Sequence, residues 1–510
     1  MIDDKITRRQ MLLGMGALGA TALVGCSRFG VLNGKPGEGN GNSPDNPGDS
    51  ASSGAGWNFI VVVCDTLRYD HVGFHGNTHI QTPNIDAFAA ESLVFDKAYA
   101  GGFPTLLNRA ELFTGRYTFA YMGWEDMRDD EIVLAEVLNQ AGYTTGIVFD
   151  TWHLKAHKTS FDRKFKSWQW IRGQEDDHYR SAPLHPTLPA APEKLRDVEA
   201  VEQYLRNVSE RQTEADYFVA QTMQTAIEWL RDNHDQNKFF LHVDSFDPHE
   251  PWDPPQSYID LYDPGYEGDE IIYPHYAPPD SLSDDELNHI QALYAAEVTL
   301  VDHWLGKLLA EIENLGLQEN TVVILKSDHG ILLGEHNSLG KAWFSPQGYR
   351  CYPLYEELIH IPLMVRVPGV AHRRISDLVQ PADLMPTILE WAGANDPGTM
   401  QGVSLASTIE DVAGSSHTPA HTSVISARAL SIGQSANPRC TVTDGEWTLI
   451  HGGAHIESEL YHLPDDPRQQ TNLLNDQCDV ARSLHADLVA FLESIGTSEG
   501  YINTWRPAPC

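Results

Sequence analysis

The sequence is poor in basic residues and in cysteine. Of its 510 residues, 35 are Lys or Arg and 71 are Asp or Glu, which gives a formal net charge of −36. Nucleic-acid binding needs a basic surface that neutralises phosphates, so this class of partner is excluded. Six cysteines, at positions 26, 64, 351, 440, 478 and 510, form no C-x-x-C pair and no dense framework. This argues against a zinc ribbon and against a disulfide scaffold. The length suits two domains, or one large α/β domain with an appendage.

The first thirty residues have the features of an export signal. Thr7–Leu12 contains an arginine pair, and the apolar run that follows, Met11–Gly25, is too short to span a bilayer comfortably. The run ends at Cys26 in a sequence that resembles a lipobox, where the cysteine is diacylated. A chance cysteine after an ordinary signal peptide is the alternative. We expect a signal peptide over residues 1–25, export by the twin-arginine route, and lipid anchoring to the membrane of the cell envelope through Cys26.

Residues 26–56 are polar and rich in Gly, Ser, Asn and Pro, which predicts a flexible linker. Apolar runs of strand length follow at 58–64, 145–149, 238–243 and 321–325, and helical stretches lie between them at 131–141, 214–233 and 284–315. Continuous apolar runs indicate strands that are covered on both faces. The predicted fold class is therefore α/β, with a doubly wound, mostly parallel sheet. Shorter runs and a final helical stretch at 480–495 predict a smaller C-terminal α+β subdomain over 411–510.

Polar residues follow three of these predicted strands. Asp65 follows the first run, residues 244–249 follow the third, and Asp328 and His329 follow the fourth. The carboxyl ends of parallel strands meet at one edge of a sheet, where α/β proteins bind their ligands. Carboxylates and an imidazole collected there suit a divalent cation. The alternative is that each aspartate caps a helix or a turn and that the histidine is a surface group.

Several motifs follow one another in a specific order between Trp57 and about Leu474. They are Asp65–His71, Gly76, Thr82–Asp86, Arg109, Thr114–Tyr117, Gly142-Tyr143, Asp247–Pro251, Ser327–Gly330, Gly334–His336, Lys341, Asp383–Thr387, Ala392-Gly393 and Glu459–Tyr461, then Asp466-Pro467 and Asn472-Leu473. This series resembles the sulfatases, which are members of the alkaline phosphatase superfamily. The resemblance implies an alkaline phosphatase-like fold, a sulfatase catalytic domain over 57–410, and hydrolysis of a sulfuric or phosphoric ester.

The resemblance also implies roles for individual residues. Asp65, Asp328 and His329 match metal ligands of the family, and we expect one divalent cation, first of all calcium, with manganese or magnesium as alternatives. His249 and Lys341 match positions that bind the oxyanion of the ester or protonate its leaving group. Arg109 matches the arginine that holds the catalytic residue. A cation, a guanidinium and an ammonium can together stabilise the charge of a sulfuryl or phosphoryl group in transfer.

The sequence departs from the family at the position of the nucleophile. Sulfatases carry Cys or Ser in a C/S-x-P-S-R motif and oxidise it to formylglycine, whereas this chain has Thr105-Leu106-Leu107-Asn108-Arg109. Threonine cannot form formylglycine, so we expect none. A cation and Arg109 can lower the proton affinity of the Thr105 hydroxyl, which would then be both a metal ligand and the direct nucleophile. The alternative is that Thr105 is an N-cap of the helix through Asn108 to Phe113.

Two smaller departures concern the surroundings of this site. Thr66 stands where the family often has a second aspartate, so fewer anionic ligands are expected. His153 stands near a position where many sulfatases have Gly-Lys-Trp-His, and it is a further candidate catalytic residue that Asp150 could position. The segments 164–180 and 252–280 are rich in Trp and Tyr and are predicted to form the rim of the site, with aromatic rings for sugars or aryl groups.

We therefore expect an exported, lipid-anchored metallohydrolase that cleaves a sulfate or phosphate ester, with Thr105 as nucleophile. A phosphoryl-group transferase, a phosphodiesterase or a phosphonate hydrolase of the same superfamily is the alternative, because a threonine phosphate is readily opened by water. A non-enzymatic member that binds a sulfated or phosphorylated glycan is a third hypothesis, suggested by the missing formylglycine precursor. The expected partners are an anionic ester and, through Cys26, a membrane.

Overall fold

The structure is a computed structural model that describes residues 56–155, 160–236, 238–345, 348–411, 418–429, 439–454 and 456–510. The predicted signal peptide, Cys26 and all but the last residue of the predicted linker lie outside the described residues.

An eight-stranded sheet forms the centre of the fold, in the order β13-β2-β12-β7-β1-β6-β4-β5. Its strands are β1 Asn58–Cys64, β2 Leu93–Ala98, β4 Thr144–Phe149, β5 Ser167–Trp170, β6 Phe239–Ser245, β7 Thr321–Ser327, β12 Leu363–Arg366 and β13 Arg373–Val379. The neighbours β7, β1, β6, β4 and β5 pair in parallel, and β12 pairs antiparallel with both β7 and β2. The four predicted strands are thus neighbours at the middle of a mostly parallel sheet.

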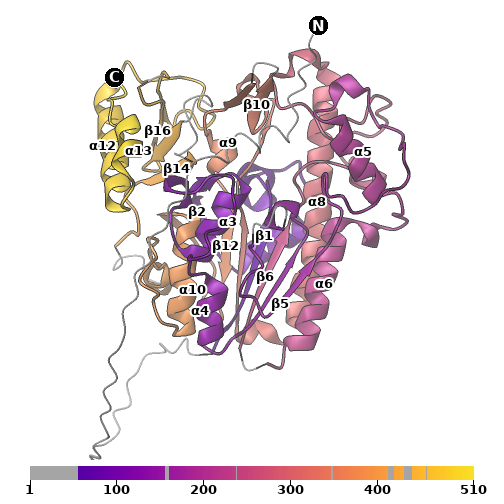
Figure 1. The fold of residues 1–510 in the computed structure, drawn as a ribbon, viewed down its shortest axis with the longest axis horizontal. Helices are drawn as coiled ribbons and strands as arrows, with labels where there is room; N and C mark the ends of the chain where they lie inside the picture. The colour runs from indigo at the N-terminus through magenta and orange to yellow at the C-terminus, as the bar shows by residue number, and fades with distance from the viewer. Residues whose placement is uncertain are drawn as a thin grey trace, which may run out of the picture. The chain divides into compact units, whose positions relative to one another are not determined.

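Helices cover both faces of this sheet (Figure 1). The helices of the described residues are α2 Pro83–Ala90, α3 Thr105–Thr114, α4 Leu134–Gln140, α5 Val198–Asn207, α6 Phe218–Asn233, α7 Gln256–Ile259, α8 Asp284–Asn314, α9 Glu356–Ile359, α10 Leu384–Ala392 and α11 Ala406–Glu410, together with α12 Cys478–Ser494 and α13 Glu499–Trp505 in the C-terminal part of the fold. Side chains of β1 alternate between two cores: Ile60 and Val62 pack with α6 and α8, whereas Phe59 and Val61 pack with α3, α4 and α10. This alternation explains the continuous apolar run and confirms the predicted doubly wound α/β fold.

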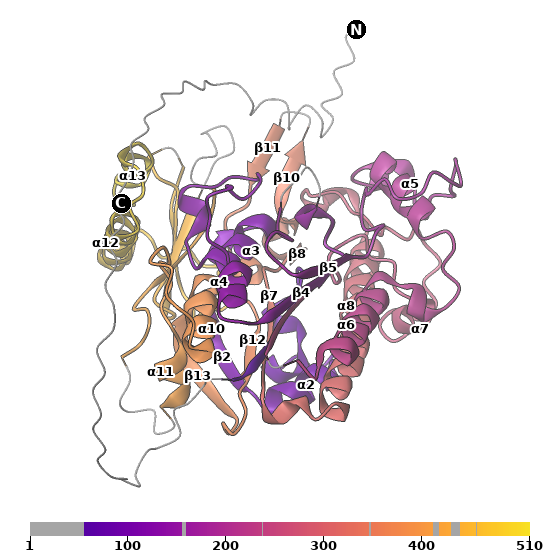
Figure 2. The ribbon, with the colours of Figure 1, turned by 60° about the horizontal axis from the view of Figure 1, so that its bottom comes forward.

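A second sheet of five strands, in the order β17-β16-β15-β14-β3, belongs to the C-terminal part of the fold (Figure 2). Its strands are β3 Gly102–Phe103, β14 Val424–Arg428, β15 Cys440–Thr443, β16 Trp447–His451 and β17 Glu459–His462. Helix α12 packs on this sheet around a third core, which contains Leu484 and Leu488. The short strand β3 lies in parallel beside β14, so the chain just before α3 is held by the C-terminal sheet.

Smaller elements complete the described part of the chain. Two-stranded sheets form from β8 Leu332–Leu333 with β9 Leu339–Gly340, and from β10 Ala342–Ser345 with β11 Gly348–Cys351. A disulfide joins Cys478, at the start of α12, to Cys510. Among the described helices, none combines the length and the apolar character that a membrane crossing requires.

Candidate metal centre and active site

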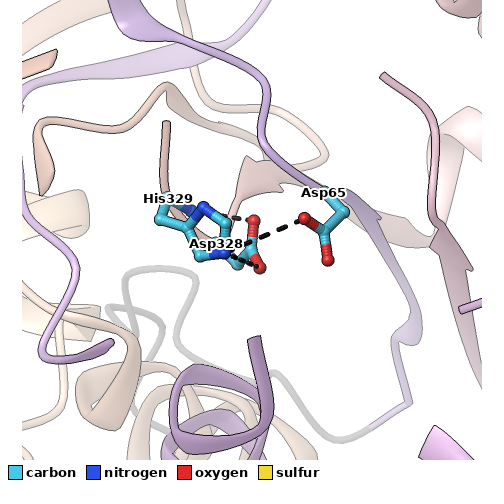
Figure 3. Close-up of side chains that lie close together, drawn as sticks. All are labelled: Asp65, Asp328 and His329. Carbon is cyan, nitrogen blue, oxygen red and sulfur yellow. Dashed lines mark hydrogen bonds and ion pairs between the residues drawn. The ribbon is translucent and has the colours of Figure 1, made fainter. Parts of the chain in front are cut away.

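Asp65, Asp328 and His329 lie together because two adjacent strands end at the same level. Cys64 of β1 pairs with Ser327 of β7, so the next residue of each strand is an aspartate at the same edge of the sheet. All three side chains are completely buried. One potential ligand atom of each residue lies within 4.8 Å of the others (Figure 3). The arrangement is thus a candidate metal centre built from the expected residues.

The electrostatics of these residues fit a divalent cation. Burial, and then the Asp328 carboxylate, raise the pKa of Asp65 well above its ordinary value, a sign of uncompensated negative charge. Asp65 Oδ2 is buried and has no well-aligned hydrogen bond, although Arg109 Nη2 is 3.2 Å away. Burial lowers the pKa of His329 well below its ordinary value, which leaves a neutral imidazole, the form that binds metals. Calcium and magnesium prefer oxygen ligands. A site of two carboxylates and one imidazole can therefore bind calcium, manganese or magnesium, but it selects among divalent cations less strongly than an all-oxygen site would.

Arg109 connects the carboxylates of this cluster. Its Nε and Nη2 donate to the two oxygens of Asp244, at 3.1 and 3.0 Å, and its Nη1 donates to Asp328. Despite burial, this guanidinium holds the pKa values of Asp244 and Asp328 below their ordinary range. One guanidinium faces Asp65, Asp244 and Asp328, so three buried carboxylates are concentrated where a cation would be held.

Thr105 is the first residue of α3 and lies beside the cluster. Its Oγ1 is 3.3 Å from Nε2 of His329, and its side chain is buried. The residue in the N-cap position is Pro104, and no side chain caps this helix. The N-cap interpretation of Thr105 is therefore wrong, because the residue is already helical and its hydroxyl faces His329.

Three further buried residues surround the cluster. Asp244 belongs to the polar segment 244–249 noted in the sequence, but no role was predicted for it, for Asn108 or for Lys326. Asp244 is the sixth residue of β6 and pairs in register with Val63. Asn108 donates to the carbonyl oxygen of Asp328 at 2.9 Å and accepts a hydrogen bond from Lys326 Nζ at 2.8 Å. Burial, and then Arg109, lower the pKa of Lys326 to about 8. The signal that could have pointed to Lys326 is its place near the C-terminal end of an apolar strand, where a buried lysine is unusual.

His249 and Lys341 form a pair of their own. Lys341 Nζ lies 2.6 Å from His249 Nε2, and both side chains are buried. The Lys341 ammonium partly opposes the rise that burial and Asp328 cause in the pKa of Asp65, and it adds to the lowering that burial causes in the pKa of His329, so its charge acts on the metal-ligand cluster. Within the described residues, no hydrogen bond joins the pair to Thr105. The structure thus brings the two predicted residues together and places their charge close to the cluster.

His153 is separated from this pair by an aromatic ring. Its Nε2 lies 3.1 Å from Glu175 Oε2, and its ring is 5.8 Å from that of Phe246, centroid to centroid. Phe246 stacks on His249 at 4.1 Å. Asp150 accepts hydrogen bonds from the Phe246 amide and from Gln174, so it holds the loop after β6. The structure brings His153 to Glu175.

The neighbours of Asp65 and the predicted rim also have defined places. Thr66 adopts a φ of 64°, its amide donates to Asp328 Oδ1 at 2.9 Å, and its hydroxyl donates to Asp65 at 2.7 Å. It therefore orients the two carboxylates without adding a third. Trp252, Tyr273 and Tyr276 are buried and form part of a core, so they do not provide exposed stacking surfaces. In the other rim segment, Trp168 and Tyr179 are about half exposed.

Comparisons with known proteins agree with this architecture. The sulfatase family model matches residues 57–394, and the model described as N-sulphoglucosamine sulphohydrolase, C-terminal, matches residues 349–494. An arylsulfatase of Clostridium perfringens is 23% identical over 495 residues, which cover 87% of this chain and 95% of the relative.

Two solved structures share the fold. The phosphonate monoester hydrolase of Agrobacterium radiobacter has a TM-score of 0.67 at 19% identity and covers 86% of this chain and 96% of its own. A protein solved with its substrate D-glucosamine-2-N,6-O-disulfate has a TM-score of 0.69 at 20% identity and covers 88% and 99% of the two chains. The family match covers more than half of the sequence and confirms the predicted family and enzyme class. This chain therefore belongs to the metal-dependent sulfatase family of ester hydrolases.

Proposed function

We propose that the protein is an exported, lipid-anchored metallohydrolase that cleaves a sulfate or phosphate ester with Thr105 as its nucleophile. One observation carries the proposal: the Thr105 hydroxyl lies 3.3 Å from His329, inside the buried cluster that Arg109 connects. Thr105 also lies four residues before Arg109, where formylglycine-forming sulfatases have their nucleophile. Since threonine cannot form formylglycine, the direct attack of its hydroxyl replaces the formylglycine chemistry.

Asp65, Asp328 and His329 would hold the cation, which when bound supplies positive charge that favours the deprotonated hydroxyl and the anionic ester. The Thr105 hydroxyl gives its proton to solvent, and its Oγ1 forms a bond to the sulfur or phosphorus as the bond to the leaving oxygen breaks. Lys341 and His249 supply the proton for that oxygen. Arg109 and the positive end of α3 offset the charge of the transferred group. Water then opens the covalent threonine ester.

Phosphorus chemistry is the second candidate, and the phosphonate monoester hydrolase with the same fold favours it. A threonine phosphate is attacked by water at phosphorus more readily than the corresponding sulfate is at sulfur. A transferase that passes the phosphoryl group to an alcohol of the envelope would use the same first step. Product analysis with and without an added alcohol acceptor separates transfer from hydrolysis.

The substrate and the cellular location rest on separate observations. The solved structure with a disulfated glucosamine supports a sulfated sugar as a substrate class. The Cys478–Cys510 disulfide supports export, because disulfides persist in oxidising compartments. Lipid on Cys26 follows from the lipobox alone. The glycan-binding hypothesis without catalysis predicts binding of the same sugars but no covalent intermediate.

The test is a substrate panel combined with mass spectrometry of the peptide that contains Thr105. Metal-loaded protein should cleave at least one aryl sulfate, phosphate monoester, phosphate diester or phosphonate. Quenched reactions should show a sulfuryl or phosphoryl adduct on Thr105. Thr105→Ala should lower kcat by about 10³-fold or more, since nucleophilic attack and its alignment are lost together.

Thr114→Ala is the matched control for this variant. Thr114 is the last residue of α3, is equally buried, and donates its hydroxyl to the carbonyl of Ala110 at 2.6 Å. It should cost stability and leave kcat within a few fold. If Thr105→Ala and Thr114→Ala behave alike, Thr105 is not the nucleophile. If no ester in the panel is cleaved while sulfated sugars bind, the glycan-binding hypothesis is favoured.

A further inference from the structure

A buried polar network surrounds the carboxylate of Glu250, next to His249. Glu250 is completely buried. Its Oε1 lies 2.9 Å from Arg196 Nη1 and accepts a hydrogen bond from the hydroxyl of Tyr276. Its Oε2 lies 3.4 Å from Nδ1 of His249. A buried carboxylate is costly unless it is paired, so these partners determine where it lies.

Arg196 packs against two aromatic rings. Its guanidinium carbon lies 3.8 Å from the ring centroid of Tyr273 and 3.8 Å from that of Tyr276. The side chain is 11% exposed, and the backbone amide donates to the carbonyl of Tyr273 at 2.9 Å. Two cation–π contacts and the ion pair with Glu250 together restrict the position of the guanidinium. Because Arg196 is itself fixed by these contacts, it fixes the position of the Glu250 carboxylate.

The hydrogen-bond partners of His249 determine which nitrogen carries its proton. The Lys341 ammonium has donors only, so His249 Nε2 accepts from it at 2.6 Å. Nδ1 then donates to the carbonyl oxygen of Glu250, also at 2.6 Å. Residue 250 thus faces Nδ1 with its carbonyl and its carboxylate, and Phe246 covers one face of the ring.

Tyr276 also touches the chain that carries Lys341. Gly340 has a φ of 92°, and a Cβ there would lie 2.0 Å from Cδ1 of Tyr276, so the ring packs directly on the glycine. The amide of Phe344 donates to the carbonyl of Tyr276 at 3.0 Å. One tyrosine therefore contacts Glu250 through its hydroxyl and the turn before Lys341 through its ring.

We propose that Arg196, Glu250 and Tyr276 are positioning residues that align the His249–Lys341 pair with the leaving oxygen of the ester. The inference rests on the proposed function, in which this pair delivers the proton. The Lys341 ammonium gives its proton to the leaving oxygen as the bond from that oxygen to sulfur or phosphorus breaks, and the amine regains a proton from solvent. Misalignment of the pair should therefore slow the loss of a basic leaving group far more than the loss of an acidic one.

The experiment compares two substrates of the same ester class, one that releases 4-nitrophenolate and one that releases a more basic phenolate. For Glu250→Gln, Arg196→Met and Tyr276→Phe, kcat should fall roughly tenfold to a hundredfold on the basic leaving group, part of the 10²–10⁴ that a positioned acid supplies. On 4-nitrophenolate the fall should stay within about threefold, with KM nearly unchanged on both. An equal fall in kcat on the two substrates would mean that Arg196, Glu250 and Tyr276 support the fold but do not align the His249–Lys341 pair.

A second arginine network supplies matched controls. Arg211 lies over the ring of Tyr217 at 4.2 Å and pairs with Asp253 at 3.2 Å, and none of these residues has a described contact with His249. Arg211→Met, Asp253→Asn and Tyr217→Phe should lower stability by similar amounts without any dependence on the leaving group. A dependence as large as in the Glu250 network would overturn the proposal.

Crystal structures of Glu250→Gln and Arg196→Met test the positioning without turnover. The distance from Lys341 Nζ to His249 Nε2 should increase, or the imidazole should adopt a second rotamer, while the contacts of Arg109 stay unchanged. An unmoved imidazole contradicts the proposal even if the enzyme is active. If the wild type cleaves no ester but the imidazole moves, the proposed function fails and the positioning role stands.

Discussion

Asp65 shows how a single residue takes its properties from both its own chemistry and its neighbours. A carboxylate is a hard oxygen ligand wherever it stands. Here it is completely buried, lies beside Asp328, and shares one guanidinium with Asp244 and Asp328. In such surroundings a negative charge destabilises the fold until a cation offsets it. Binding of the cation and stability of the fold are therefore linked at this residue.

The effect of Asp65→Asn on the free energy of unfolding should change sign between metal-loaded and metal-free protein. With EDTA, the variant should be as stable as the wild type or more stable, because an amide carries no charge next to Asp328. With saturating calcium, it should be less stable, and its affinity for the cation should fall roughly 10-fold to 100-fold or more, the scale seen for altered metal sites. Metal content and thermal unfolding with and without EDTA measure both effects.

Asp302→Asn is the control for Asp65→Asn. Asp302 is a buried carboxylate on α8 that accepts hydrogen bonds from Asn84 and from the amide of Ile85. Its loss should lower stability equally with and without metal. A wild type that contains no ion and shows no shift with calcium, manganese or magnesium would contradict the metal assignment.

A buried histidine of helix α8 contacts two acidic residues of the neighbouring loop 263–270. His289 is buried on this helix, with Nδ1 2.8 Å from Asp263 and Nε2 2.9 Å from Glu270, and its ring stacks on Tyr266 at 3.7 Å. Burial lowers the pKa of His289, but the hydrogen bonds to Glu270 and Asp263 outweigh it and raise that pKa above its ordinary value. When it is protonated, the imidazole pairs with both carboxylates and holds the loop over residues 263–270 against the helix.

The sign of this linkage predicts how stability depends on pH. A raised folded pKa means that the contribution of His289 is fully present below the unfolded value, about 6.5, and is lost as pH rises through the folded value. The difference in free energy of unfolding between wild type and His289→Gln should therefore be largest near pH 6 and shrink toward pH 9. Urea unfolding at fixed metal concentration measures it. For His303→Gln, at a half-exposed site on the same helix, the difference in free energy of unfolding from the wild type should stay near zero at every pH. A difference for His289→Gln that grows with pH would contradict this mechanism.

The molecule as a whole is strongly acidic, while its site attracts anions. The net charge is −36, yet Arg109, Lys341 and a bound cation would meet the ester. Long-range repulsion acts over about 10 Å at 0.1 M salt, whereas the contacts in a buried site are screened much less. The acidity therefore describes the solvent-facing residues and slows the approach of anionic substrates without weakening their binding in the site.

Ionic strength should separate these two effects. Between about 20 and 200 mM salt, a range over which the screening length shortens several-fold, kcat/KM should rise for an ester that carries further anionic groups. For an ester of the same class with a neutral remainder it should rise less, and kcat should stay constant for both. Steady-state kinetics at constant metal concentration measure this. If kcat/KM falls with salt for the multiply charged ester, the local positive field extends beyond the site and the repulsion argument fails.

Much of the fold and of the metal centre could be predicted from the sequence. The apolar runs at 58–64, 145–149, 238–243 and 321–325 correspond to β1, β4, β6 and β7, because a strand that is buried on both faces cannot tolerate polar alternation. The metal-ligand cluster could be predicted because its aspartates directly follow two of these strands. The domain boundaries at 410 and 411, the role of His153 and the lipid on Cys26 stay predictions.

Only the tertiary structure decided which groups meet around the chemistry. Thr105 is a first-turn residue rather than a cap because Pro104 precedes it and because β3 pairs with β14, far along the chain. Lys326 and Arg196 stand in sequence that carries no motif, and the polar segment and the motif that contain Asp244 and Glu250 do not reveal their partners, since the contacts join residues that are tens to hundreds of positions apart. The sequence by itself determined residue chemistry and the local period of burial, which act over a few residues. The pairing of buried charges depends on long-range packing, so it became visible only when the sheet brought the segments together.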